Sequence, residues 1–282
     1  MKRKIIPGQI PTKDLHQYII GAVAPRPIAF VSTLDENGIQ NLAPYSFFNA
    51  FSSNPPIVVF SSNRRVSDNT TKDTLHNVRV TKECVVNVVP YEIVRQMSLA
   101  SVEFPSSVSE FDKVGLTPEQ SETVSAPGVL ESPVNLECKV KDIIELGEHG
   151  GAGHLIICEV TCISVSESVL NGDRLDPNKL DLMGRLGRNY YVRASGAALM
   201  EIHQSVTEIP LGFDRLPVEV RNSSILTGNE LAALASLIAI PKKEDVDYTG
   251  DVGFHSIIEK HQKASQLISE GKVKEAMYLL TN

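Results

Sequence analysis

Small polar side chains stand beside aromatic residues in the stretch 24–49, APRPIAFVSTLDENGIQNLAPYSFFN. The polar members are Ser32, Thr33, Asn41 and Ser46, and the aromatic members are Tyr45, Phe47 and Phe48. Such a mixture suits a flat, amphipathic ring, because apolar groups can cover its faces and hydrogen-bonding groups can reach its edges. The same residues also fit an ordinary buried hairpin whose polar positions belong to its turn and edges, so the stretch alone leaves both interpretations open.

A second group of residues could bind an anion. Lys72, Asp73 and Thr74 stand where a helix is predicted to begin, and free N–H groups with the positive end of the helix dipole favour negative charge there. Further polar and basic residues lie just upstream: Ser61, Ser62, Arg64 and Arg65. The alternative is a plain helix start beside a solvated basic loop. Combined with the stretch 24–49, the pattern describes a site for flavin mononucleotide (FMN), with its ring at one end and its phosphate at the other.

Other chemistries have little support in the sequence. No GxSxG, HExxH or Ser-x-x-Lys pattern stands in a supporting context, so we name no catalytic side chain. No GxGxxG or Walker loop is present, which argues against a Rossmann or P-loop nucleotide site. His149 and His154 flank a glycine turn, but their spacing matches no standard metal site, and we predict none. The four cysteines are interpreted as small buried apolar residues in a reducing compartment.

Composition limits the classes of partner. The 282 residues are 42% hydrophobic and 22% charged, as in ordinary globular proteins, and the net charge is −7. Because phosphate backbones are bound by basic surfaces, nucleic acid is not expected as a partner. Pro7 and Gly8 interrupt any signal-peptide core, and no stretch approaches the roughly 18 apolar residues of a membrane span. We therefore expect a cytoplasmic protein without a membrane partner.

The elements that must position these residues are mostly strands. Strands at 28–33 and 39–43 are joined by a turn at Asn37-Gly38, and Pro44 is expected to end the second strand. Later apolar or alternating runs predict strands at 57–63, 83–90, 134–140, 154–170 and 190–195, and helices at 12–18 (capped by Thr12), from 71–73 onward and at 91–100. The weakly patterned excursion 101–133 is interpreted as a long loop or lid. Long antiparallel strands joined by a glycine turn suggest a barrel.

The sequence pattern changes from strand-like to helical near residue 196. Thr227 or Asn229 can cap a helix at 230–239, and a final helix from about His255 to Leu280 is expected to be divided by Gly271. We therefore predict two parts, a domain at 1–195 and a helical extension at 196–282.

Four segments, APRPIAFVST, NLAPYSFFN, PPIVVFSSN and KDTLHNV, follow one another in an order and spacing that resemble a known family. The chain is similar to the flavin reductase-like FMN-binding split-barrel family, which includes flavoredoxin-type proteins and reductase components of two-component monooxygenases. The resemblance continues more weakly through GHLIICEV and LGRNYY and covers about residues 15–195. It implies a mainly β fold, a six-stranded antiparallel split barrel with peripheral helices and, in this chain, a C-terminal helical extension.

The resemblance also implies a site. FMN would lie at or near a homodimer interface, and the matching positions in this chain are Ser32, Thr33, Asn41, Ala43, Pro44, Tyr45, Ser46, Ser61, Ser62, Lys72, Asp73, Thr74, Asn77 and His154. The sequence departs from the family pattern before His154, where GAGH replaces the frequent GDH. The extension 196–282 has no counterpart in the short reductases.

The function implied is that of an NAD(P)H:flavin oxidoreductase, in which hydride passes from NADH or NADPH to flavin. Electrons would leave to free flavin, to a partner monooxygenase or to another acceptor. The alternative from the same residues is a flavin-binding electron carrier or sensor that does not turn over nicotinamide and uses its helical extension to bind a partner. A split barrel that holds haem or a deazaflavin is a third interpretation.

Overall fold

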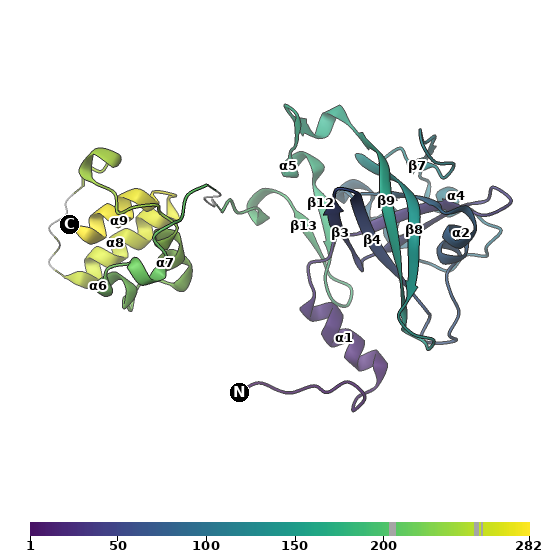
Figure 1. The fold of residues 1–282 in the computed structure, drawn as a ribbon, viewed down its shortest axis with the longest axis horizontal. Helices are drawn as coiled ribbons and strands as arrows, with labels where there is room; N and C mark the ends of the chain where they lie inside the picture. The colour runs from purple at the N-terminus through teal and green to yellow at the C-terminus, as the bar shows by residue number, and fades with distance from the viewer. Residues whose placement is uncertain (203–206, 251–253, 255) are drawn as a thin grey trace. The chain divides into compact units, whose positions relative to one another are not determined.

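The computed structural model describes residues 1–202, 207–250, 254 and 256–282, which form two compact units, Met1–Met200 and Glu201–Asn282 (Figure 1). The first unit contains all of the β-sheet, and the second is helical. Helix accounts for 31% and strand for 27% of the described residues, so the expectation of a mainly β protein was wrong, and the fold is mixed. The helical second unit and the helices around the sheet make the difference.

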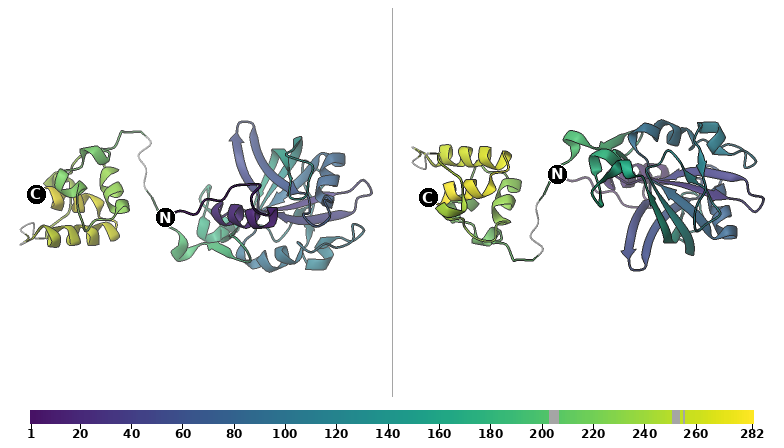
Figure 2. Two further views of the ribbon diagram at one scale, coloured as in Figure 1. Left: turned by 90° about the horizontal axis from the view of Figure 1, so that it is seen from below. Right: turned by 90° about the horizontal axis from the view of Figure 1, so that it is seen from above.

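A seven-stranded antiparallel sheet organises the first unit, in the order β2-β1-β5-β8-β9-β4-β3. Its strands are β1 (Ala29–Leu34), β2 (Gln40–Tyr45), β3 (Phe48–Ser53), β4 (Pro56–Asn63), β5 (Glu83–Asn87), β8 (Val134–Glu145) and β9 (Gly153–Val165). Six strands were expected. The additional one is β3, which lacks a buried face and therefore lacks the alternation that marks a strand in sequence. The β3–β4 hairpin projects from the rest of the sheet (Figure 2).

The stretch 24–49 is consequently more than one hairpin, because its last two residues begin β3. The expectation that Pro44 ends the return strand was also wrong, since Pro44 pairs with Phe30 and the strand continues to Tyr45. Strand β2 stands at the edge of the sheet, where a residue without an N–H group costs no ladder hydrogen bond on its open side. The strand can therefore carry Pro44 into the region where the site is predicted.

Helices surround the sheet and position the predicted anion site. Helix α2 (Asp73–Thr81) begins where the sequence predicts and packs on β1 and β2. Helix α1 (Thr12–Ala22) is preceded by Pro11 at its cap position, so the expected cap by Thr12 was wrong. The remaining elements of this unit are η1 (Tyr91–Ile93), α3 (Val94–Leu99), α4 (Glu110–Val114), β6 (Pro118–Glu119), β7 (Gly128–Val129), η2 (Glu167–Val169), β10 (Leu170–Asn171), β11 (Arg174–Leu175), α5 (Pro177–Leu180), β12 (Leu182–Arg185), β13 (Tyr191–Ala194) and η3 (Gly196–Ala198).

Alternation along β1 and β2 separates two cores. One core, inside the curved sheet, contains Val31, Tyr45 and Phe60 together with the buried free thiols of Cys84, Cys138 and Cys158. The other lies on the opposite face of β1 and β2, where Phe30 and Leu42 meet α3 and α4. Because neighbouring residues of a strand point to opposite faces, Ser32 and Thr33 enter different cores.

The second unit has its own apolar core, to which α6 (Val218–Arg221), α7 (Gly228–Ala235), α8 (Ile257–Ser269) and α9 (Val273–Thr281) contribute buried residues. Its short helices η4 (Phe213–Arg215) and η5 (Lys243–Asp245) have no buried residue. Thr227 caps α7 in a capping box with Glu230, which confirms one of the two predicted caps. Gly271, at φ +77°, divides α8 from α9 as predicted, while the expected start at His255 lies outside the described residues. No helix in the described part of the chain has the length and apolar character needed to cross a membrane.

Candidate cofactor site

A buried polar network joins the start of α2 to the β1–β2 hairpin. Thr33 and Asn41 are directly opposite each other in the hairpin. The Thr74 hydroxyl donates to Asn41 Oδ1 at 2.7 Å, and Asn77 Nδ2 donates to Thr33 Oγ1 at 3.0 Å. All four side chains are buried, so these hydrogen bonds replace the ones to water that the side chains lose on folding. The network sets the position of the residues at the beginning of α2 relative to β2.

Glu110 completes this network from the excursion 101–133. Its Oε2 accepts hydrogen bonds from Asn41 Nδ2 at 3.1 Å and from the backbone N–H of Leu42 at 2.9 Å. Burial raises the pKa of this carboxyl, and the nearby Asp73 carboxylate raises it further. Sequence reasoning missed Glu110, although an acid next to an apolar residue (Phe111) inside a long loop is a signal that the loop returns to the core.

Lys72 is a half-buried cation that forms no ion pair among the described residues. Burial lowers the pKa of its ammonium, the neighbouring Arg65 lowers it further, and the Glu103 carboxylate partly opposes this shift. Nζ lies 5.1 Å from the centre of the Tyr45 ring, and no described residue gives it a hydrogen bond or an ion pair. A desolvated charge is costly unless it is paired, so this position favours an anionic ligand.

Two pockets meet at Lys72. A pocket of about 250 Å³ is lined by His16, Ile20, Arg26, Pro44, Tyr45, Ser46, Phe47, Ser61, Asn63, Lys72 and Arg185. A pocket of about 80 Å³ is lined by Asn41, Ala43, Arg65, Lys72, Asp73, Thr74, Ala100, Ser101, Val102, Glu103, Phe104 and Glu110. The first contains the rings of Tyr45 and Phe47 together with cationic side chains, whereas the second contains Arg65, Lys72, three acidic side chains and the start of α2. The aromatic groups of the first pocket suit the ring of the predicted ligand, and the start of α2 in the second suits its phosphate.

Nine of the predicted site residues line these two pockets, and five do not. Ser32 is buried on the other face of β1, where its hydroxyl donates to the carbonyl of Pro127 and accepts from Asn87. Thr33 supports the network described above. Asn77 lines a different hollow of about 270 Å³, beside acidic side chains. Ser62 and His154 pair across β4 and β9, and His154 Nδ1 lies 3.0 Å from the Ser62 carbonyl oxygen.

Buried polar atoms without a partner gather near the same place. They are Tyr45 Oη, Ser62 Oγ and His154 Nε2, for which no hydrogen bond is formed among the described residues. Burial raises the pKa of Tyr45 to about 12, although the Thr74 and Ser62 hydroxyls nearby oppose that shift. Three buried polar atoms close to the pockets therefore lack a hydrogen bond from the described part of the protein.

The pKa of Tyr45 predicts how stability depends on alkaline pH. An unfolded tyrosine has a pKa near 10.0 and the folded one has a pKa near 12, so the contribution of Tyr45 to stability is fully present below pH 10.0. It is lost as the pH rises through 12, by about 2 kcal/mol at pH 12 itself. Tyr45→Phe should remove this loss and change stability at neutral pH by less than about 1 kcal/mol, since the lost hydroxyl has no partner. Urea unfolding of both proteins across this pH range measures it. Tyr190→Phe, at an exposed tyrosine, is the control and should behave as the wild type does.

Arg26 is a buried guanidinium that sequence reasoning missed, although it stands in the APRPIAF segment. Its Nη1 donates to the carbonyl of Ile20 at 2.6 Å and to that of Val23, and Nη2 donates to the carbonyl of Leu186 at 3.1 Å. Nε reaches Ser46 Oγ at 3.4 Å. One side chain thus ties the end of α1 and the β12–β13 turn to the pocket wall.

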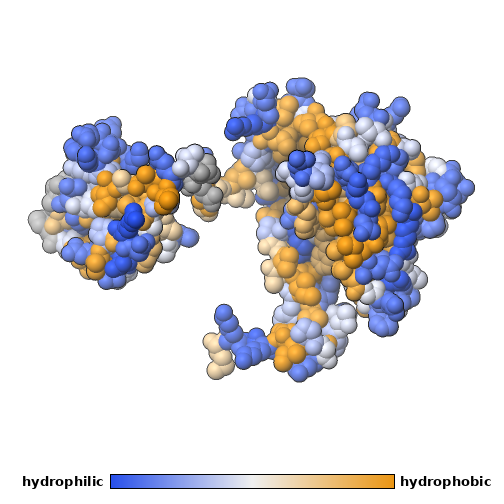
Figure 3. All heavy atoms as spheres, viewed as in Figure 1, coloured by the Kyte–Doolittle hydropathy of each residue, from blue (hydrophilic) through white to orange (hydrophobic). Residues whose placement is uncertain are grey.

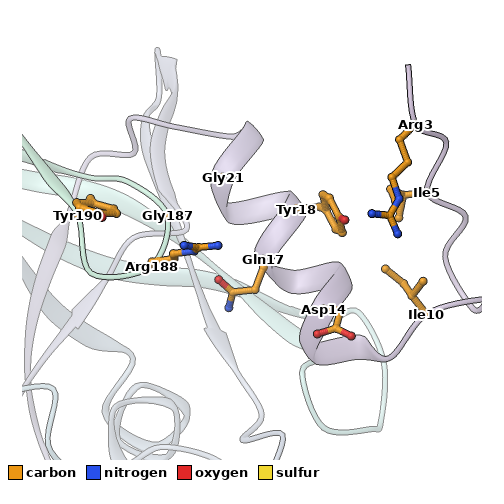
Figure 4. Close-up of a pocket in the computed structure, with 10 residues that line it drawn as sticks. All are labelled: Arg3, Ile5, Ile10, Asp14, Gln17, Tyr18, Gly21, Gly187, Arg188 and Tyr190. Carbon is orange, nitrogen blue, oxygen red and sulfur yellow. The ribbon is translucent and has the colours of Figure 1, made fainter. Parts of the chain in front are cut away.

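A separate hollow of about 680 Å³ lies beside α1 (Figure 4). It is lined by Arg3, Ile5, Ile10, Asp14, Gln17, Tyr18, Gly21, Gly187, Arg188 and Tyr190. None of the predicted site residues lines it, so its volume does not make it the candidate site. In the described part of the chain, no group of three or more His, Cys, Asp or Glu side chains is placed to hold a metal ion.

Comparison with known proteins gives one consistent result. A family model described as "Flavin reductase like domain" matches residues 21–179. An uncharacterized protein of Aquifex aeolicus is 42% identical over 190 residues, which are 67% of this chain and 94% of that protein. The crystal structure of nitrilotriacetate monooxygenase component B from Bacillus cereus superposes with a TM-score of 0.67 at 31% identity, covering 72% of this chain and 99% of that one. A split-barrel protein from Shewanella frigidimarina shares the fold at 23% identity, with a TM-score of 0.59, over 69% of this chain and 95% of its own.

Proposed function

This chain belongs to the flavin reductase-like domain family, and we propose that it binds FMN in the pockets that meet at Lys72 and acts as an NAD(P)H-dependent flavin reductase. Proteins of this family typically bind FMN. The single observation that carries the proposal is the position of Lys72, a half-buried cation without an ion pair among the described residues, between an aromatic pocket and the start of a helix. A ligand with a flat ring and a phosphate satisfies both sides of that position.

The residues present fit this cofactor. Lys72 would balance the phosphate charge, and the N–H groups of Asp73 and Thr74 precede the first hydrogen bond of α2, which runs from Leu75 N to the carbonyl of Lys72 at 3.0 Å. Pro44, Tyr45 and Ser46 would face the ring in the larger pocket. The remaining predicted residues are proposed as support: Ser32, Thr33, Asn41, Ala43, Ser61, Ser62, Asn77 and His154.

FMN, when bound, would supply the redox chemistry, accepting a hydride equivalent from NADH or NADPH and releasing electrons to an acceptor. The protein's part is to hold and orient. Hydride transfer needs no side-chain base. Free flavin, a partner monooxygenase or another small molecule could receive the electrons, and the likeness to a monooxygenase component B supports the second of these.

We extend the proposal to a homodimer in the cytoplasm. Apolar side chains gather on the face of the first unit around β9 (Figure 3). Ile144, Ile163 and Phe51 of the sheet are 43%, 56% and 68% exposed. Helix α1 has no buried residue. Apolar surface of this kind is typical of an interaction site, and a second copy of the chain would cover it. The role of the helical unit Glu201–Asn282, which lies beyond the residues matched by the family model, is left open.

A visible spectrum of the purified protein tests the proposal. We expect flavin absorption after incubation with FMN, and rapid anaerobic bleaching when NADH or NADPH is added. A yellow protein that ignores both nucleotides would support the electron carrier or sensor instead. A protein that takes up no FMN would contradict both functions, and a haem or deazaflavin spectrum would reveal a different ligand. Adding NADPH to FMN without protein is the control for uncatalysed reduction.

A further inference from the structure

The excursion 101–133 crosses the smaller pocket and is attached to its rim at three points. Glu110 accepts from Leu42 N and Asn41, as described above. Ser106 Oγ donates to Asp73 Oδ1 at 3.0 Å, at the first residue of α2. Glu103 forms an ion pair with Arg65 on the pocket wall. Residues of the excursion thus approach the groups that would bind the phosphate.

The Arg65 guanidinium is held in place by the protein. Its Nη1 donates to Thr70 Oγ1 and to the carbonyl of Thr71, both at 2.8 Å, in the segment that leads into α2. It lies close enough to Lys72 to lower the pKa of that ammonium. The pocket therefore contains two neighbouring cations, and among the described residues only Arg65 forms an ion pair with a carboxylate. The same carboxylate also raises the pKa of Lys72.

That carboxylate belongs to Glu103, whose side chain is 67% exposed, whereas that of Arg65 is 23% exposed. An exposed carboxylate returns to water at little cost, because surface ion pairs contribute only modestly to stability. Ser106 and Glu110 hold the excursion independently of Glu103. A ligand can therefore replace the Glu103 carboxylate on Arg65 through a movement of the Glu103 side chain alone. A phosphate dianion matches paired cations better than a single carboxylate does.

We propose that Glu103 is an affinity- and specificity-determining residue that competes with the flavin phosphate for Arg65. The inference rests on the proposed FMN site and deepens it. While the pocket is empty, Glu103 neutralises Arg65, and a phosphorylated flavin must displace it. The competition weakens FMN binding but not riboflavin binding, because riboflavin has no phosphate. FMN is thereby kept exchangeable, as suits a flavin that is bound, reduced and released.

The test measures dissociation constants for FMN and riboflavin by fluorescence titration. For Glu103→Gln we expect FMN to bind about threefold to tenfold more tightly at low ionic strength, with a smaller gain at high ionic strength and no change for riboflavin. Glu119→Gln, at an exposed residue of the same excursion, is the matched control and should leave both constants unchanged. In an Arg65→Gln background, Glu103→Gln should lose most of its effect on the dissociation constant for FMN. A double-mutant cycle measures this coupling.

Three results would overturn the inference: unchanged or weaker FMN binding by Glu103→Gln, equal tightening for riboflavin, or an undiminished effect without Arg65. If the wild type binds FMN normally while Glu103→Gln has no effect, only this inference fails. If the wild type binds no flavin at all, the proposed function fails with it.

Discussion

The dissociation constant for FMN should rise at least about tenfold when Lys72 and Thr74 are both replaced by alanine. Lys72 is the half-buried cation that lines both pockets, and Thr74 stands at the first turn of α2. Two charge-assisted or hydroxyl contacts contribute about 1 to 3 kcal/mol each, so their joint loss is readily measured. Fluorescence titration or equilibrium dialysis with FMN gives the constant directly.

The structure divides this effect between the two residues. The Thr74 hydroxyl proton is already donated to Asn41 Oδ1, so this side chain would act on the ligand mainly by holding the start of α2 in place. We therefore expect Lys72→Ala alone to account for most of the loss, and Thr74→Ser to retain nearly wild-type affinity. Lys113→Ala, at an exposed lysine of α4, is the matched control. Unchanged FMN affinity in the double variant would remove Lys72 and Thr74 from the site.

Arg26→Ala should destabilise the first unit by about 3 kcal/mol. The side chain is 6% exposed, and its removal leaves the carbonyls of Ile20, Val23 and Leu186 without their donor. The three bonds are part-buried and come from a charged donor, and hydrogen bonds of charged groups contribute more than average ones. Chemical denaturation followed by circular dichroism measures the free energy of unfolding. FMN affinity should fall as well, because Ser46 and Phe47 lose the contacts that position them.

Two variants make this result specific to the guanidinium. Arg26→Lys keeps the charge but not the forked donor geometry, so its stability should fall between those of the wild type and Arg26→Ala. Arg95→Ala, at an exposed arginine of α3, should change stability by less than about 0.5 kcal/mol. Equal stability for Arg26→Ala and Arg95→Ala would show that the bonds of Arg26 do not hold these segments together.

Local patterns predicted a large share of the fold. Helix α2, strands β4 and β5, the break at Gly271 and the Thr227 cap follow from apolar spacing and from residues whose conformational preferences are strong. The errors fall where such preferences are weak. Strand β3 is exposed along its length, so no alternation marks it, and Pro44 is tolerated only because β2 stands at the sheet edge.

The candidate site also contains residues that the sequence could predict and residues that it could not. Its nine pocket-lining residues lie in two short segments and at Ser61, so sequence order alone could group them. Glu110, Arg65 and Arg26 escaped the predicted set, since their roles depend on partners 69, 38 and 160 positions away in the chain. Ser32 and Thr33 are neighbours in sequence but enter different cores, because strand geometry turns successive side chains to opposite faces.

By itself, then, the sequence determined the family, the order of most elements and the residue types that suit a flat ring and a phosphate. Those properties reside in short segments, where local backbone preferences and side-chain chemistry suffice. Only the tertiary structure decided which of these residues share a pocket, that Lys72 is half-buried without an ion pair among the described residues, and that Glu103 forms an ion pair with Arg65. Burial and pairing arise from contacts between distant segments, and the free energy of a charge depends on those surroundings.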